Sequence, residues 1–360
     1  MTVRRAPLWA AALLLALAAP GAAFDHGVDI SSLPRVEAGG ARFRDAQGAA
    51  DALTLLQRAG VDAVRLRLWH TPADTLTDLR AMLVLARRAH ALGMRIVLDL
   101  HYSDTWADPG HQAPPRAWRG LAFEALADSV EHWTRHTVGA FVAQGTVPAR
   151  VQTGNEIDHG LLWDDGRLDE RDPRTWDRLA LLLRRAGAGV RAAAPKQRIG
   201  VMLHLTTSAT PAGTLAFIEQ LAVRGVTFEA IGLSYYPLWH GGFRRLEATL
   251  ALLGKRQRRP LYVIETGYPW TLQAFDRTHN VVGTSQALLR GMAADPGGQA
   301  RFVTAVRTAL ARTPSGRGAG VYWWEPAWIA APEAGSPWEN CALFDSTGLA
   351  LPALRALGAR

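Results

Sequence analysis

The chain has 360 residues, of which 48% are hydrophobic and 20% are charged, a composition typical of a globular protein and not of a disordered one. The formal charge of +8 comes almost entirely from arginines that are scattered along helix-like segments. We interpret this charge as a compositional bias, because no basic run or recognised motif indicates a partner such as a nucleic acid.

Residues 1–23 have the pattern of a targeting segment. Arg4 and Arg5 precede a short leucine-rich run, and the small residues Gly21 and Ala23 stand where a signal peptidase would recognise them. The pattern predicts a signal peptide that is cleaved near Ala23, and a secreted or periplasmic mature protein. An uncleaved membrane anchor is the alternative, but the apolar run is short for that role.

The rest of the chain alternates between short apolar runs and longer segments with helical spacing. The expected strands are 26–31, 62–69, 94–102, 148–156, 198–204, 228–236, 260–266 and 319–325. The expected helices are 49–60, 76–93, 121–145, 175–194, 212–225, 243–256, 297–313 and 349–358. Residues 24–360 show no linker or low-complexity stretch, so we expect one domain.

Eight strand–helix units predict a single α/β domain, a (β/α)8 TIM barrel with long strand-to-helix loops that form a substrate cleft. A doubly wound open sheet is the structural alternative. That fold usually has a glycine-rich phosphate loop after its first strand, and no such loop is present.

In a barrel of this kind, the residues at the carboxyl ends of the strands face the active site. Glu156 ends the fourth strand and Glu265 ends the seventh, so the two should face each other across the mouth. Either residue alone could be a solvated side chain or the partner of an arginine. Together they suit glycosidic bond cleavage, which needs one protonated and one ionised carboxyl group. The other strand-end residues are Asp29, Arg67, Trp69, His101, Asn155, His204, Tyr235, Tyr236, Trp324 and Glu325.

The stretch "HYSDTWADPG" (101–110) directly follows the third strand and is rich in aromatic and polar side chains. Trp106 is a candidate platform for the apolar face of a sugar, and Asp104 and Asp108 could order the loop or bind hydroxyls. His101 points into the reacting subsite or makes a structural hydrogen bond. Other tryptophans in predicted mouth loops are Trp118, Trp163, Trp239, Trp270, Trp324, Trp328 and Trp338.

Several segments carry a resemblance to a known family. They are "GVDISSL", "VRLRLW", "HYSDTWADPGHQAPPRAW", "QTGNEIDHGLLW", "IGLSYYPLWH", "VIETGYPW", "VYWWEPAWI" and "WENCALFD", and they run in order from Gly27 to Asp345. The chain resembles glycoside hydrolase family 53, the arabinogalactan endo-β-1,4-galactanases, within the clan of retaining (β/α)8 glycosidases.

The resemblance implies an endo-acting enzyme that cleaves β-1,4-galactan, the side chains of pectin, by double displacement with retention. It implies that Glu156 is the acid/base and Glu265 the nucleophile. It maps a strand-2 arginine to Arg67 or Arg65, and a tyrosine that contacts the nucleophile to Tyr235. We therefore expect the substrate to be bound by Asp29, Arg67, His101, Trp106, Asn155, His204, Tyr235 and Trp324.

No cofactor and no metal are expected. Some bacterial relatives bind calcium in the loop after the seventh strand, but this chain keeps only Asp276, His279 and Asn280 of such a set, and calcium prefers six to eight oxygen ligands. We expect a monomer whose partner is the polysaccharide substrate, without nucleic acid or membrane. The alternative functions are a β-mannanase or xylanase of the same clan, and a non-catalytic sugar-binding barrel.

Overall fold

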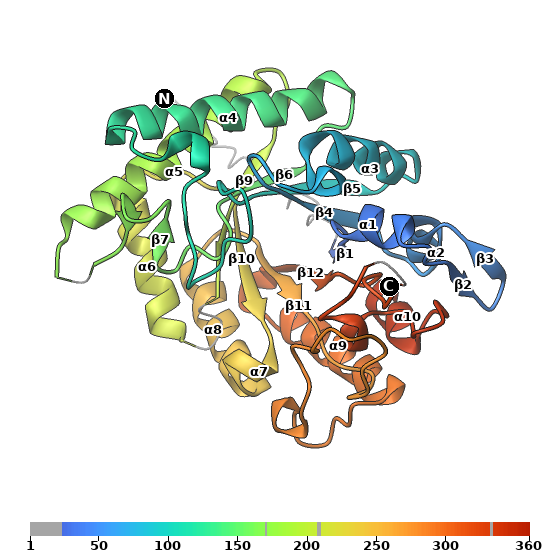
Figure 1. The fold of residues 1–360 in the computed structure, drawn as a ribbon. Coiled ribbons are helices and arrows are strands. Elements are labelled where there is room, and N and C mark those ends of the chain that lie inside the picture. Colours follow the sequence, from blue (N-terminus) through green and yellow to red (C-terminus); the bar gives the residue numbers. More distant parts are fainter. Residues whose placement is uncertain (1–23, 170, 207–209, 332–333) are drawn as a thin grey trace, which may run out of the picture.

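A computed structural model describes residues 24–169, 171–206, 210–331 and 334–360, so the predicted signal peptide lies outside the described residues. Eight parallel strands close into a barrel in the order β1-β4-β5-β6-β9-β10-β11-β12, and β12 pairs with β1 (Figure 1). The predicted TIM barrel is confirmed. Its strands are β1 (Asp25–Asp29), β4 (Ala63–Leu68), β5 (Arg95–Leu100), β6 (Arg150–Thr153), β9 (Gly200–Leu205), β10 (Ala230–Tyr235), β11 (Leu261–Thr266) and β12 (Gly318–Trp324).

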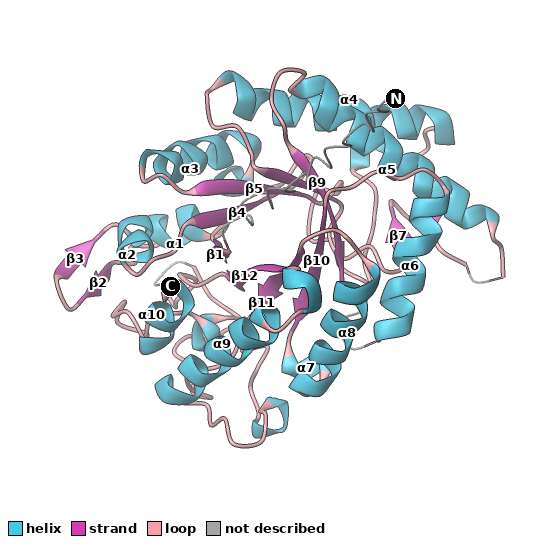
Figure 2. Cartoon of the chain, turned by 180° about the vertical axis from the view of Figure 1, so that it is seen from behind, coloured by secondary structure: helices cyan, strands magenta, loops and turns pink. Residues whose placement is uncertain are grey.

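Helices surround the barrel on its outer side, as Figure 2 shows from behind. Each of the eight predicted helical segments contains one, with ends that differ by a few residues. They are α2 (Ala52–Arg58), α3 (Leu79–Ala91), α4 (Phe123–Ala143), α5 (Arg174–Ala193), α6 (Pro211–Val223), α8 (Phe243–Arg256), α9 (Pro296–Ala311) and α10 (Pro352–Gly358). Among the helices of the described residues, none combines the length and the apolar character that crossing a bilayer requires.

The loops after the strands contain short elements that the periodicity did not predict, because they are too short to show a period. They are α1 (Leu33–Ala38), the hairpins β2 (Phe43–Asp45) with β3 (Gly48–Ala50) and β7 (Gly160–Leu161) with β8 (Gly166–Arg167), and α7 (Pro237–His240).

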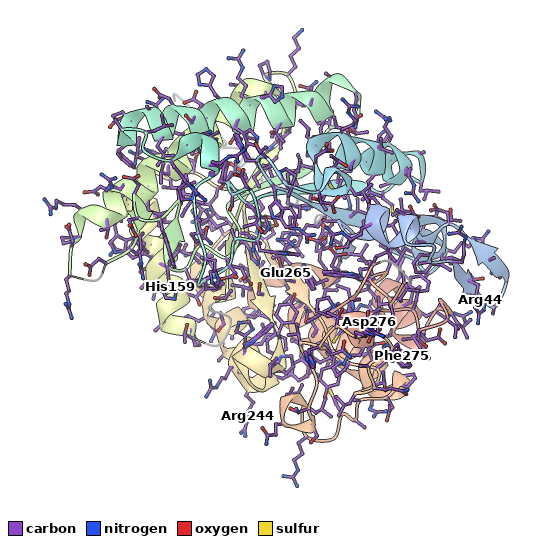
Figure 3. The ribbon with its side chains drawn as sticks, in the orientation of Figure 1. Arg44, His159, Arg244, Glu265, Phe275 and Asp276 are labelled. Carbon is purple, nitrogen blue, oxygen red and sulfur yellow. The ribbon has the colours of Figure 1, made fainter. Side chains whose placement is uncertain are left out.

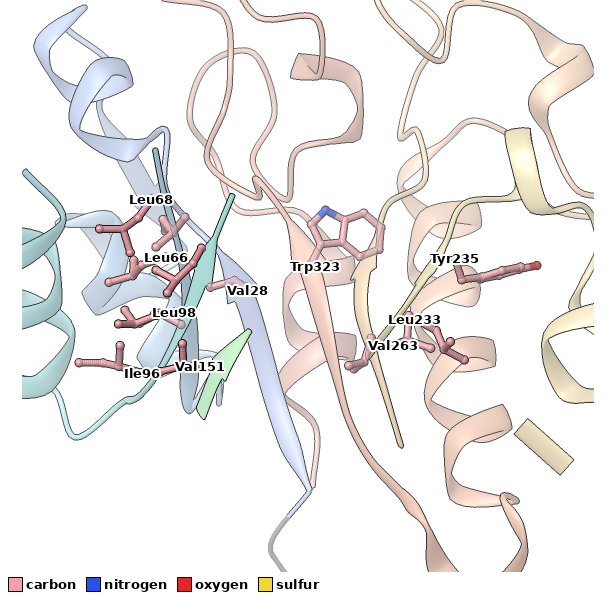
Figure 4. Packing of buried hydrophobic residues seen from close by; sticks show 14 of the residues in the cluster. Val28, Leu66, Leu68, Ile96, Leu98, Val151, Leu233, Tyr235, Val263 and Trp323 are labelled. Atoms are coloured by element: carbon pink, nitrogen blue, oxygen red, sulfur yellow. The ribbon is translucent and has the colours of Figure 1, made fainter. Parts of the chain in front are cut away.

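Strand alternation separates the buried side chains into two sets. On β4, Leu66 and Leu68 belong to the large apolar cluster between strands and helices, part of which Figure 4 shows. Ala63 belongs to a second cluster with Val97, Met202, Tyr262 and other residues that come from the strands alone. Arg65 and Arg67 stand on the same inward face of β4 as Ala63, two and four residues further along, so the barrel interior becomes polar toward its carboxyl end.

Candidate active site

A pocket of about 300 Å³ lies at the carboxyl end of the barrel. Glu156 and Glu265 both line it, as the sequence predicted. In Figure 3, Glu265 lies near the centre of the ring of strands, away from Asp276 and Phe275. The pocket is lined by Arg65, Arg67, His101, Trp106, Ala107, Asp108, Asn155, Glu156, Tyr236, Trp239, Glu265, Val281, Trp324, Trp328, Pro337 and Trp338.

Glu265 ends β11 beside a buried arginine. The Arg65 Nη1 atom lies 2.7 Å from Oε1 of Glu265, and the Tyr236 hydroxyl donates to Oε2 at 3.2 Å. Burial raises the pKa of Glu265 to about 7, although the Arg65 guanidinium acts in the opposite direction. Burial and the nearby Glu265 carboxylate also raise the pKa of the Tyr236 hydroxyl well above its usual value, so the hydroxyl keeps its proton and donates it in the hydrogen bond.

Glu156 follows β6 in a left-handed turn, with φ of 48°. Its Oε1 atom accepts a hydrogen bond of 2.6 Å from the Ser234 hydroxyl. Desolvation, followed by the charge of Glu265, raises the pKa of Glu156 well above its usual 4.5, and the Ser234 bond only partly counteracts this rise. Arg65 contacts Glu265, whereas no guanidinium in the described part of the chain contacts Glu156, so Glu265 has the lower pKa of the two and Glu156 keeps its proton to higher pH.

The Arg65 guanidinium organises this end of the barrel. Its side chain is 1% exposed, and it contacts Asp29 at 2.7 Å, Asp99 at 2.9 Å and the Asn155 Oδ1 atom at 2.9 Å. Burial alone would lower the pKa of Arg65, but Asp99, Glu265 and Asp29 together raise it, so the guanidinium stays charged. Burial alone would raise the pKa of Asp99, but the Arg65 guanidinium and the neighbouring His101 together lower the pKa of that carboxyl to about 2. Of the two arginines that the sequence left open, Arg65 is therefore the partner of Glu265.

Five of the predicted substrate-binding residues line the pocket, and they are Arg67, His101, Trp106, Asn155 and Trp324. Trp106 is 38% exposed, which fits a platform for a sugar ring. His101, in contrast, has both ring nitrogens engaged. Its Nδ1 accepts from the Ala107 backbone N–H at 3.0 Å and its Nε2 donates to Asp99 at 2.9 Å, so its hydrogen bonds fix the loop that follows β5.

Three of the predicted substrate-binding residues lie outside the pocket lining. Asp29 is fully buried and accepts from Arg65 and from the Ser31 hydroxyl, at 2.7 Å each. His204 is also fully buried. Because the Glu156 backbone N–H donates to its Nδ1 at 3.3 Å, the proton of the neutral ring is on Nε2, which donates to Ser234 Oγ at 2.8 Å. Asp29 positions Arg65 and His204 positions Glu156, and both of those residues line the pocket. Asp29 and His204 do not reach the pocket themselves, so the prediction that they bind substrate is wrong.

The third correction concerns Tyr235. Its side chain points away from the pocket into the cluster between strands and helices (Figure 4), stacks on Phe302 and donates to the Gly241 carbonyl at 3.0 Å. Tyr236, the next residue, contacts Glu265 instead. Strand alternation could have identified it, because Ile231, Leu233 and Tyr235 form the apolar outward set of β10.

One group of three side chains with metal-ligating atoms occurs in the described parts of the chain. It consists of Glu156, His204 and Glu265, whose donor atoms lie within 4.8 Å of one another. Both nitrogens of His204 already have protein partners, which makes the group a poor metal site. In the loop after β11, both Asp276 carboxylate oxygens accept backbone N–H groups, from Thr278 at 2.5 Å and Ser336 at 2.7 Å.

Two carboxyl groups with separated pKa values, facing each other over a pocket with aromatic walls, can cleave a glycosidic bond. The proton donor protonates the leaving oxygen, and the ionised group attacks or stabilises the anomeric carbon. The Tyr236 hydroxyl and the Arg65 guanidinium orient the ionised group.

We expect Tyr236→Phe to lower kcat/KM for glycoside hydrolysis by about 10- to 100-fold, because it removes a hydrogen bond to a charged group that is worth roughly 1.5–3 kcal/mol. Tyr235→Phe is the matched control. It should keep activity within about twofold and lower the melting temperature, because it leaves the partly buried Gly241 carbonyl without its donor. Loss of activity in Tyr235→Phe and wild-type activity in Tyr236→Phe would contradict the assignment.

Comparison with known proteins gives the same chemistry. The model of glycosyl hydrolase family 53 matches residues 25–357. The chain is 36% identical over 360 residues to the arabinogalactan endo-beta-1,4-galactanase of Cellvibrio japonicus, which covers 95% of this chain and 94% of that protein.

Solved structures agree. The family 53 catalytic domain of Ignisphaera aggregans has a TM-score of 0.87 and 34% identity, covering 93% of this chain and 95% of that one. A structure from a study of two fungal beta-1,4-galactanases has a TM-score of 0.80 and 28% identity, and the match covers 93% of this chain and 98% of that one. The chain therefore belongs to glycosyl hydrolase family 53 and is a glycoside hydrolase.

Proposed function

We propose that the protein is an endo-β-1,4-galactanase that cleaves its polysaccharide by double displacement with retained configuration. The observation that carries the mechanism is the separation of the catalytic groups. One carboxylate oxygen of Glu156 lies within 4.8 Å of one of Glu265. Retaining glycosidases hold their carboxyl groups about 5–5.5 Å apart, whereas inverting enzymes leave about 6.5–9.5 Å for a water molecule.

In the first step, the Glu265 carboxylate attacks the anomeric carbon while Glu156 gives its proton to the leaving glycosidic oxygen. The bond to the leaving sugar breaks and a covalent glycosyl-enzyme forms. In the second step, Glu156 takes a proton from water, the water oxygen attacks the same carbon, and Glu265 leaves as a carboxylate. Arg65 and Tyr236 compensate the charge that returns to Glu265.

The galactan specificity rests on the family and on the name of the Cellvibrio relative. The pocket is compatible with it, because Trp106, Trp239 and Trp324 offer aromatic surface to the apolar face of galactose. The Asn155 amide donates one N–H to the Ala107 carbonyl at 2.8 Å, and its other N–H is the donor that we assign to the hydroxyl next to the reacting carbon.

Export is part of the proposal and rests on residues 1–23 alone. The mature protein would be a secreted or periplasmic monomer. Mass spectrometry of the exported protein should find Phe24 as its first residue, and a protein that retained Met1 would contradict cleavage.

The substrate is tested by release of reducing sugar from β-1,4-galactan, mannan and xylan at equal concentrations. We expect cleavage of galactan and little or none of the other two, because the matched family carries that specificity. A comparable rate on mannan or xylan would assign the chain another substrate within the same mechanism.

The two glutamates are separated by azide rescue on a galactoside with a good leaving group. Glu265→Ala should lose nearly all activity, and added azide should give a glycosyl azide of inverted configuration, because azide replaces the nucleophile. Glu156→Ala should keep a fast first step, accumulate the covalent intermediate, and give an azide product of retained configuration. The opposite stereochemistry in the two variants would reverse the roles, and an inverted product from the wild type would exclude double displacement.

The pH dependence of kcat/KM should be bell-shaped, with Glu265 on the acid limb and Glu156 on the alkaline limb. The Ser234 hydroxyl stabilises ionised Glu156 and so lowers its pKa. Ser234→Ala should therefore raise that pKa and move the alkaline limb upward by roughly 0.5–1 pH unit, with the acid limb unchanged. Ser336→Ala, which removes a buried hydroxyl that donates to the Trp328 carbonyl, is the control and should move neither limb. A downward shift of the alkaline limb would contradict the role of Glu156.

A further inference from the structure

Beneath the Trp106 ring lies a buried ion pair that the two catalytic steps do not use. The Arg67 guanidinium carbon is 4.0 Å from the centroid of the Trp106 ring and 5.1 Å from that of Trp69. Its Nη1 atom is 3.2 Å from Oε1 of Glu325, the residue that follows β12. Arg67 is 3% exposed and Glu325 is 1% exposed, so the guanidinium and the carboxyl group are both removed from water under an exposed indole.

Glu325 is fixed from two directions. The Ser32 backbone N–H donates to its carboxylate at 3.1 Å and the Ser32 hydroxyl donates at 2.9 Å. Its own backbone N–H donates to the Asp29 carbonyl at 3.0 Å. Its φ of 49° is left-handed, which costs energy in a residue other than glycine. A strained backbone with a buried side chain persists only where its surroundings specify its position.

Arg67 is fixed as well. Its backbone N–H donates to the Ser31 hydroxyl at 2.8 Å, and it pairs with Asp99 in the β4–β5 ladder. A guanidinium held over an indole ring attracts it, and a desolvated contact of this kind is worth up to about 2 kcal/mol. Trp69 and Trp324 meet the same indole at 78° and 55°, which limits its rotation. Trp106 nevertheless lines the pocket and is 38% exposed, so part of its ring remains available to a sugar.

We propose that Glu325 and Arg67 are positioning residues for the Trp106 sugar platform. Glu325 holds the guanidinium, and the guanidinium holds the indole in the orientation that receives the apolar face of a sugar. This assignment rests on the proposed function, because a platform requires a polysaccharide. It differs from direct binding of substrate by Arg67, the role that the sequence predicted, since here Arg67 acts through Trp106.

A double-mutant cycle tests the assignment on soluble β-1,4-galactan, with Glu325→Gln, Trp106→Ala and the double variant. Glutamine keeps the shape of the side chain and removes its charge. Glu325→Gln should raise KM by about fivefold and change kcat by less than about twofold, because it weakens binding through the platform. In the Trp106→Ala background, Glu325→Gln should have no further effect.

Glu339→Gln is the matched control, because Glu339 is a second buried carboxyl after β12 and has no contact with Arg67 in the described part of the chain. It should leave KM unchanged. Arg67→Lys keeps the charge and loses the contact of the guanidinium with the Trp106 ring, so it should raise KM as Glu325→Gln does. It provides the test if Glu325→Gln does not fold.

The position of the ring is measured without substrate by 19F NMR of protein labelled with 5-fluorotryptophan. The Trp106 resonance is assigned by its loss in Trp106→Phe, and it should shift in Glu325→Gln and in Arg67→Lys but not in Glu339→Gln. Equal effects of Glu325→Gln with and without Trp106, or an unmoved Trp106 resonance, would overturn the proposal. Failure of the galactan assay in the wild type would instead overturn the proposed substrate, and the NMR result would still decide the platform.

Discussion

One buried guanidinium, that of Arg65, connects the strands whose ends form the site. It contacts Asp29 on β1, Asp99 on β5, Asn155 after β6 and Glu265 on β11. Removing a guanidinium from water is costly unless its partners are all in place, and the same is true of each carboxylate. Closure of the barrel and placement of the Glu265 carboxyl group therefore depend on each other, because the strands must assemble before these charges can neutralise one another.

The same constraint explains why the two glutamates differ. Glu265 shares the positive charge of Arg65, whereas Glu156 faces a hydroxyl and the negative charge of Glu265. Two chemically identical side chains thus acquire different proton affinities from their surroundings. Two residues further along β4, Arg67 forms a similar buried ion pair with Glu325. Its guanidinium lies over the Trp106 indole, whereas that of Arg65 contacts Glu265. In the account proposed here, Arg65 of "VRLRL" supports the chemistry at Glu265 and Arg67 supports the Trp106 platform.

The barrel and the position of Glu156 and Glu265 at the pocket could be predicted from the sequence, because the strands and helices show their own periods and strand ends converge in a closed barrel. The roles of the other residues at the site could not be predicted, for a physical reason. Asp29 and His204 also lie at strand ends, but their side chains bind residues that are distant in the sequence. Asp29 binds Arg65, and His204 binds Ser234. Family resemblance points to Tyr235, but Tyr236 makes the contact with Glu265, and the apolar outward face of β10 distinguishes the two. Partners that are 30 or 36 residues apart leave no local pattern.

The most direct test of this account is the order in which the two carboxyl groups lose their protons. It can be measured by 13C NMR titration of protein labelled at the glutamate side-chain carboxyl, with the two signals assigned from Glu156→Gln and Glu265→Gln. The account predicts that Glu265 ionises at lower pH than Glu156, and that the pKa of Glu156 falls when Glu265 is replaced by the neutral glutamine. Ionisation of Glu156 before Glu265 in the wild-type protein would contradict it.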